Sequence, residues 1–156
     1  MKDKKVVLPN SFISIAEENL KVGNKVKLLA DGESMYPFIR GGRDTVEISP
    51  VDGNTSLRLY DCFLCKWQNR YIIHRLVGIK DDKWIMAGDG NYRRKEIVGR
   101  NDIIGIVKKI IRPDGTVVEC GDPSWARKGC FWVKIRPLRR VMLPVIRRIN
   151  VLERFF

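Results

Sequence analysis

The chain has 156 residues, of which 44% are hydrophobic and 31% charged, a balance that is typical of one globular domain and excludes disorder along most of the chain. The net charge of +12 favours an acidic partner, such as an anionic membrane surface, nucleic acid or an acidic peptide. No uncharged run approaches the roughly 18 apolar residues of a membrane span, and the basic N-terminus meets Pro9 before an apolar signal core develops. We therefore expect a cytoplasmic chain.

The first two thirds of the sequence predict one short helix followed by strands. Ser14 and Glu17 have the spacing of a capping box and Gly23 is a stop signal, so we expect a helix over residues 11–21. Short runs rich in Val, Ile and aromatic residues then alternate with turns that contain Gly, Asp or Pro. The expected strands are residues 25–29, 45–48, 62–67, 71–79, 83–87, 103–111 and 116–120. The pattern predicts a mostly β fold.

The composition changes after Asp122-Pro123. Residues 125–156 hold nine Lys and Arg but one Glu, and Pro137 suits the first position of a helix that Pro144 would kink or split. On a helical wheel an apolar stripe lies largely opposite the arginines. The stripe is Leu138, Met142, Val145, Ile149, Leu152 and Phe156, and the arginines are Arg139, Arg140, Arg147 and Arg154. We divide the chain into a mostly β domain, residues 1–122, and a basic amphipathic tail, residues 123–156.

Two uses of this tail stay open. The stripe can lie in an anionic membrane surface at the inner face, with the arginines towards the headgroups, or it can pack on the protein's own sheet. Nucleic acid is disfavoured, because few aromatic residues stand between the arginines to stack on bases.

The four cysteines do not predict a metal site. Cys62 and Cys65 have the spacing of a zinc pair, but in a strand residues three apart point to opposite faces. Cys120 and Cys130 are widely spaced and have no neighbouring His. Without an export signal a disulfide framework is not expected either, so we interpret the cysteines as small buried residues.

Ser34 and His74 are the candidates for nucleophilic chemistry. Ser34 lies between Gly32 and Pro37, in a segment that suits a turn presenting a hydroxyl, although turn serines are common. His74 is the single histidine and stands inside an apolar strand, where a histidine is more often a hydrogen-bonded core residue than a base. An imidazole that titrates near pH ~6.5 is nevertheless what activation of a serine at neutral pH requires.

A series of short boxes resembles the type I signal peptidases, in the branch that uses Ser and His, within the superfamily that also contains LexA-like proteins. The nucleophile box is Gly32-Glu-Ser34-Met-Tyr-Pro37 followed by Gly42-Arg-Asp44, and the base box is His74-Arg75-Leu76-Val77. Gly88-Asp89-Gly90-Asn91 is similar to the Gly-Asp box that follows in those enzymes. The boxes occur in the family's order over about residues 25–111.

The resemblance implies a twisted, barrel-like β-sheet with a β-ribbon, a short N-terminal helix and a basic helical tail. It implies a serine endopeptidase that removes a leader or signal-like segment from a precursor, with Ser34 as nucleophile and His74 as base, and without a metal or organic cofactor. Asp89 is the first candidate to orient His74, and Glu96 the second, because Lys95 stands where the Ser–His branch has a further Asp. Asp89 could instead be a turn residue.

Further expectations concern two neighbouring residues and two rival functions. Met35 should pack beneath the nucleophile turn, and Arg75 should point to the opposite strand face from His74, solvated or in a salt bridge. One rival function is LexA-like self-cleavage, disfavoured because the base is His and only 33 residues precede Ser34. The other is an inactive module of the same fold that binds membrane or nucleic acid through its charge.

Overall fold

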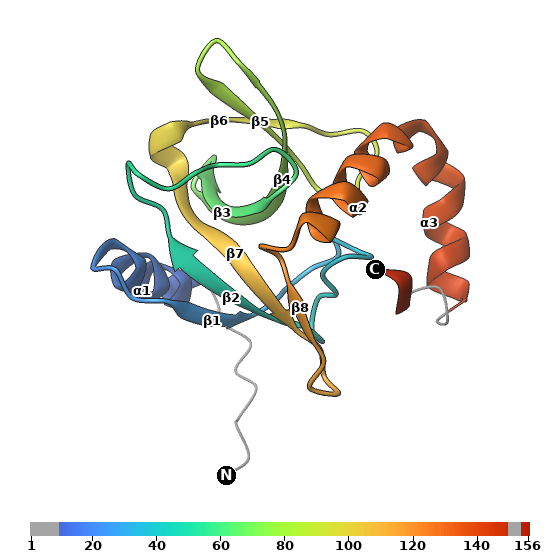
Figure 1. Cartoon of the computed structure of the whole chain (residues 1–156), viewed down its shortest axis with the longest axis horizontal. Helices are drawn as coiled ribbons and strands as arrows, with labels where there is room; N and C mark the ends of the chain where they lie inside the picture. The colour runs from blue at the N-terminus through green and yellow to red at the C-terminus, as the bar shows by residue number, and fades with distance from the viewer. Residues whose placement is uncertain (1–9, 150–153) are drawn as a thin grey trace.

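One antiparallel sheet of eight strands dominates the computed structural model, which describes residues 10–149 and 154–156. The strands lie in the order β1-β2-β7-β3-β4-β5-β6, with β8 paired to β7, and the sheet curls into a half-barrel (Figure 1). Their bounds are β1 Val26–Leu29, β2 Thr45–Pro50, β3 Cys62–Trp67, β4 Arg70–Lys80, β5 Lys83–Ala87, β6 Glu96–Gly99, β7 Ile103–Ile111 and β8 Val117–Glu119. The predicted mostly β fold is confirmed.

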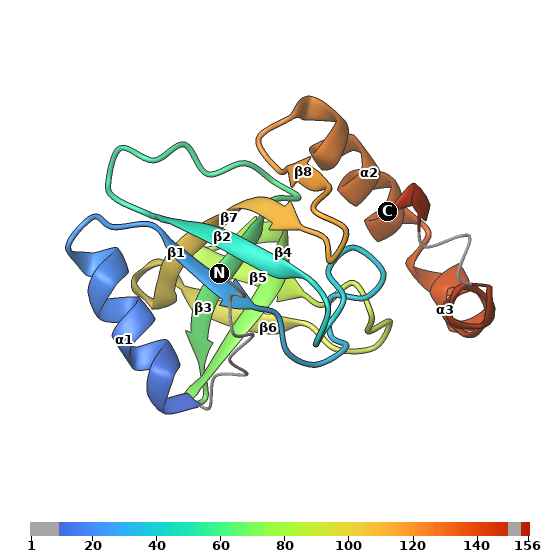
Figure 2. The same ribbon diagram turned by 90° about the horizontal axis from the view of Figure 1, so that it is seen from below.

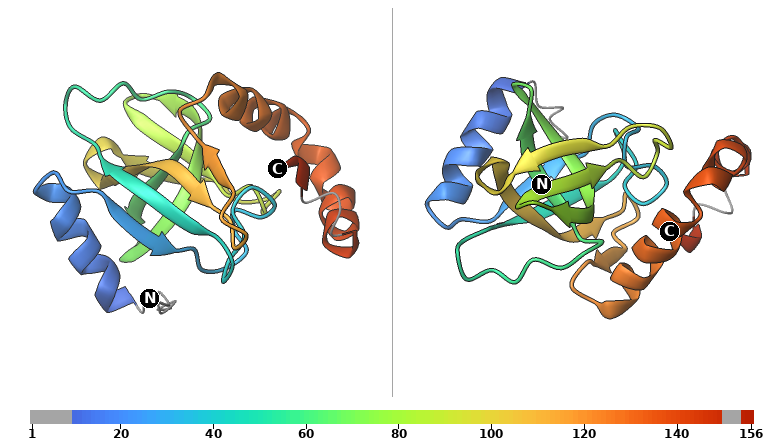
Figure 3. Two further views of the ribbon diagram at one scale, coloured as in Figure 1. Left: turned by 60° about the horizontal axis from the view of Figure 1, so that its bottom comes forward. Right: turned by 90° about the horizontal axis from the view of Figure 1, so that it is seen from above.

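Helices lie at two ends of this sheet. The expected N-terminal helix is present as α1 (Asn10–Lys21), and the C-terminal helices are α2 (Pro123–Lys134) and α3 (Arg139–Arg148). Single 3₁₀ turns occur at Arg100–Asp102 and Arg136–Leu138. Figures 2 and 3 show α1 on one side of the sheet and α2 and α3 on the other.

Strand β3 separates two hydrophobic clusters. Cys62 and Leu64 belong to the larger cluster, whereas Phe63 and Cys65 belong to the smaller one, so the two thiols point to opposite faces as the strand period predicts. Burial raises the pKa of the Cys62 thiol well above its ordinary value and that of Cys65 to about 12. Both thiols therefore stay protonated and serve as packing groups.

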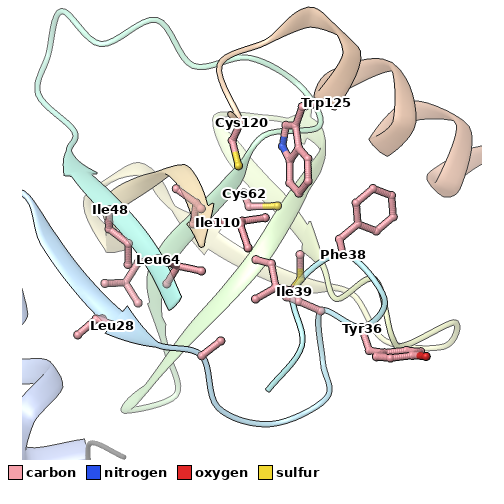
Figure 4. Packing of buried hydrophobic residues seen from close by; sticks show 14 of the residues in the cluster. Leu28, Tyr36, Phe38, Ile39, Ile48, Cys62, Leu64, Ile110, Cys120 and Trp125 are labelled. Atoms are coloured by element: carbon pink, nitrogen blue, oxygen red, sulfur yellow. The ribbon is translucent and has the colours of Figure 1, made fainter. Parts of the chain in front are cut away.

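Helix α2 is part of the larger cluster. Asp122 caps it by accepting a hydrogen bond from the Ser124 N–H, and Pro123 occupies the first turn. Trp125 and Trp132 are buried, and their rings lie 5.4 and 5.8 Å from that of Phe38 in edge-to-face contacts. Figure 4 shows Trp125 pointing from the C-terminal segment towards Phe38. The segment predicted as a tail thus contributes to the same core as the sheet.

Helix α3 buries a different face from the predicted one. Arg139 was expected in solvent but is 1% exposed, because its guanidinium donates to the Trp132 carbonyl oxygen over the Trp132 ring. Leu143 and Ile146 complete the buried face. Of the predicted apolar stripe, Leu138, Val145 and Ile149 are exposed, Met142 and Phe156 pack partly against the core, and Leu152 lies outside the described residues.

Within residues 10–149 and 154–156, none of the helices has the length and apolar character needed to cross a membrane.

The role of α2 in the core predicts a large difference between two adjacent residues. Trp132→Ala should lower the free energy of unfolding by about 3–5 kcal/mol, since it removes a fully buried ring. Phe131→Ala should change it by no more than about 0.5 kcal/mol, because the Phe131 side chain is 62% exposed. Urea denaturation followed by circular dichroism measures both values, and equal effects would show that α2 is not a core element.

Candidate active site

Ser34 lies on a turn between β1 and β2 whose neighbouring side chains are buried. Ser34 itself is exposed, whereas Met35, Phe38 and Ile39 are each at most 4% exposed and belong to the larger cluster. The expectation that Met35 packs beneath the turn is confirmed. Because these apolar anchors hold the turn from below, the hydroxyl-bearing residue is presented at the surface.

Asp44 closes this turn from its far end. Its carboxylate accepts a hydrogen bond from the Arg40 N–H at 2.7 Å and binds the guanidinium of Arg112, which also donates to the Phe38 carbonyl oxygen. The Ala30 N–H donates to the Asp44 carbonyl oxygen at 2.8 Å, so the chain returns beside its own start. The Gly-Arg-Asp44 box is thus structural, and Arg112 is a supporting residue that the sequence alone did not indicate.

His74 is buried in the middle of β4, opposite Phe63 of β3. Its ring Nδ1 lies 2.8 Å from Oε2 of Glu96, the first residue of β6. The carboxylate is an acceptor, so Nδ1 carries the hydrogen of this bond and Nε2 is left as the acceptor nitrogen in the neutral ring. This orientation is the one that a histidine base requires.

The loop Gly88–Gly90 brings the Ser34 turn against His74. The Gly90 N–H donates to the Ser34 carbonyl oxygen at 2.8 Å. A Cβ atom added to Gly88 would lie 2.5 Å from the Ser34 carbonyl oxygen and 3.2 Å from His74 Nε2, so both groups border the same small space. A Cβ on Gly90 would lie 2.3 Å from the Glu33 carbonyl oxygen. Both positions need glycine because backbone segments meet there.

No hydrogen bond joins the Ser34 hydroxyl to His74 within the part of the chain that the structure describes. The structure therefore places the backbone of Ser34 beside the His74 ring, with no hydrogen bond between the two side chains among the described residues. Such bonds are often long in enzymes without substrate and shorten in the complex.

Asp89 does not orient His74, and that prediction is wrong. Its two carboxylate oxygens accept hydrogen bonds from Arg75 Nε and Nη2 at 2.9 and 2.6 Å. Arg75 and Asp89 are 0% and 1% exposed, so the ion pair is entirely buried. The physical reason is the strand alternation, because Arg75 follows His74 and points to the opposite face, where the Asp89 side chain also lies. The second candidate, Glu96, occupies the orienting position.

Other groups complete the surroundings of Arg75. Its Nη1 donates to the Tyr60 carbonyl oxygen at 2.6 Å, and its guanidinium lies 4.5 and 4.9 Å from the ring centres of Phe38 and Trp125. Burial alone would lower the pKa of Arg75, but the neighbouring Asp89 carboxylate raises it above its ordinary value. Trp132 Nε1 donates to the Asp89 carbonyl oxygen at 2.9 Å, which ties α2 to the same loop.

A cavity of about 190 Å³ opens beside Ser34. One wall is the end of β1 and the chain that follows it, and the other is the first half of β4. The lining is mainly apolar and consists of Ile13, Leu28, Leu29, Ala30, Asp31, Gly32, Ser34, Met35, Ile39, Leu64, Tyr71, Ile72 and Ile73. Its volume and apolar lining would accommodate one or two apolar side chains of a bound ligand.

Comparison with known proteins returns no family model, no curated protein and no solved structure that matches the chain. Among the described residues, no group of three or more His, Cys, Asp or Glu side chains is arranged to hold a metal ion.

The buried ion pair predicts that Asp89 matters for stability. Asp89→Ala should lower the free energy of unfolding by about 3–5 kcal/mol, because it leaves the Arg75 charge buried and unpaired. The double variant Arg75→Met with Asp89→Ala should lose less than the two single variants together, by at least about 1 kcal/mol. Additive losses in urea denaturation would contradict the pairing.

The close approach at Gly88 yields a second prediction. Gly88→Ala should displace the Ser34 turn from His74, because the new methyl group would overlap the Ser34 carbonyl oxygen. A changed His74 ring signal in the NMR spectrum, with the fold retained, would report this displacement. Gly53→Ala is the matched control, since a Cβ there meets nothing within 4 Å. An unchanged His74 signal in Gly88→Ala would contradict the proximity.

Proposed function

We propose that the chain is a serine endopeptidase in which Ser34 is the nucleophile, His74 the general base and Glu96 the residue that positions the base. The observation that carries this proposal is the orientation of His74. Glu96 holds Nδ1, while Nε2 borders the same space as the Ser34 turn. A buried carboxylate, an imidazole and an exposed serine in this order form the arrangement that activates a serine for acyl transfer.

The reaction would proceed by way of an acyl-enzyme. His74 Nε2 takes the Ser34 hydroxyl proton as Oγ bonds to the scissile carbonyl carbon, and Glu96 stabilises the imidazolium. The imidazolium then gives this proton to the leaving amine as the C–N bond breaks. A water molecule, activated by His74 in the same way, releases the acyl group as a carboxylate and restores Ser34. The Ser34 N–H, which has no partner among the described residues, is a donor for the oxyanion.

The substrate would be an extended peptide. β1 pairs only with β2 in the described chain, and the pairing of β4 with β5 begins at Arg75, so residues 70–74 have one unpaired edge. The cavity beside Ser34 lies between these two edges. A strand placed there could form backbone hydrogen bonds on either side and insert apolar side chains next to the scissile bond. A leader or signal-like segment of a precursor has this character.

The decisive experiment replaces the nucleophile and the base separately. Ser34→Ala and His74→Ala should each reduce cleavage by about 10³-fold or more while the fold is retained. The measurement is the appearance of new peptide N-termini, by mass spectrometry, when purified protein is incubated with a peptide library. Ser56→Ala is the matched control, because Ser56 is an exposed loop serine far along the chain from these residues. Cleavage by the wild type that survives Ser34→Ala would reject the proposal, as would a wild type that cleaves none of the library peptides.

The role of Glu96 can be separated from that of Asp89. Glu96→Gln should lower the turnover number by about 10²-fold or more with a smaller effect on KM, because the carboxylate acts when the imidazolium forms. Its free energy of unfolding should fall less than that of Asp89→Ala. A Glu96→Gln enzyme with the wild-type turnover number would exclude Glu96 from the mechanism.

A further inference from the structure

Helix α3 presents a second apolar face that the fold does not use. Leu138, just before the helix, and Val141, Val145 and Ile149 follow one another at spacings of three or four residues and are 59%, 69%, 44% and 47% exposed. Residues at these spacings share one side of a helix. We call these four residues the outer stripe.

The outer stripe is distinct from the face that holds α3 in place. Leu143 and Ile146 are 4% and 3% exposed and belong to the larger cluster, together with the buried Arg139. On a helical wheel this buried face is centred about 120° from the outer stripe. In Figures 1, 2 and 3, α3 lies at the periphery of the molecule, away from the sheet. The outer stripe is therefore free to contact a partner without rearrangement of the core.

The charges around α3 identify the kind of partner. From Pro123 to Ile149 the sequence holds eight Lys and Arg and no Asp or Glu. Arg140 projects on the side of the helix opposite the outer stripe and Arg148 flanks the stripe, whereas the Arg147 guanidinium lies 5.3 Å from the ring centre of Tyr36 in the protein itself. An apolar face combined with an arginine-rich polar face is the pattern of a helix that lies in the plane of an anionic membrane surface.

We propose that α3 docks on anionic lipid bilayers, with the outer stripe in the boundary between headgroups and acyl chains and with Arg140 and Arg148 at the headgroups. A second copy of the chain fits less well, because it would bring another helix of the same positive charge against this one. Nucleic acid fits less well because the exposed face is apolar, whereas phosphate contacts need charged or polar groups. The proposal does not depend on the catalytic role of Ser34.

Liposome flotation of the full-length protein tests the proposal. The wild type should float with vesicles of phosphatidylcholine and phosphatidylglycerol at low salt, and much less with phosphatidylcholine alone or at high salt. Val141→Asp and Val145→Asp should each weaken binding by about tenfold or more, since each places a carboxylate against the anionic surface. Val22→Asp is the matched control, because Val22 is 75% exposed at the end of α1 and should bind as the wild type does.

The remaining outcomes decide against the proposal. Absence of flotation by the wild type, or equal losses in Val22→Asp and Val141→Asp, would overturn it. Sedimentation that shows a dimer abolished by Val141→Asp, without lipid binding, would assign the outer stripe to a second copy. Ser34→Ala should float like the wild type, so that failure of the peptidase proposal and failure of membrane docking are separately visible.

Discussion

The buried ion pair between Arg75 and Asp89 is the interaction on which the rest of the structure depends. Two charges in the interior are tolerated only where each is paired and hydrogen-bonded, and here four polar or aromatic groups surround the guanidinium. The contacts come from Tyr60 just before β3, from Asp89 in the Gly88–Gly90 loop, from Phe38 after the Ser34 turn and from Trp125 of α2. Gly129 of α2 leaves room for the guanidinium, because a Cβ atom at this position would lie only 2.4 Å from Arg75 Nη1.

The same pair links the core to the candidate active site. His74 and Arg75 are consecutive in β4 and therefore point to opposite faces of the strand. Asp89 lies between Gly88 and Gly90, which contact Ser34, His74 and Glu33. When Arg75 holds Asp89, it also fixes the loop that keeps the Ser34 turn beside the imidazole. Precise placement of reacting groups generally needs such support from residues that do not react themselves.

The sequence predicted where strands and helices lie better than it predicted which side chains contact one another in the fold. Alternation and turn residues located seven strands and α1, whereas β6 was missed because its two apolar residues, Ile97 and Val98, stand between a charged run and Gly99. Ser34 and His74 became candidates through their boxes and remain a prediction. Glu96 ranked behind Asp89 because the contact of a side chain with His74 depends on the register of β4, β5 and β6, which local sequence does not encode.

The C-terminal helices also show that a local pattern does not determine tertiary contacts. A helical wheel identifies an apolar stripe but not which of two faces the core will cover, and α3 has apolar residues on both. Burial of Arg139 depends on Trp132 of α2, a helix that the charge-rich sequence concealed. Burial lowers the pKa of Arg139 to about 10, so the residue remains a cation at neutral pH and its hydrogen bonds to the Trp132 carbonyl persist.

Helix α3 also contacts the turn that carries Ser34. The Arg147 guanidinium lies 5.3 Å from the ring centre of Tyr36, two residues after Ser34, and Phe156 packs on Phe38 at 5.2 Å. A membrane-docked α3 would thus hold the turn on the side of the helix that faces away from the lipid, one helix diameter (~10 Å) from the surface. If the chain cleaves peptides, this position favours precursors whose leader is itself bound to the membrane, because both would be confined to the same surface and their effective concentration would rise.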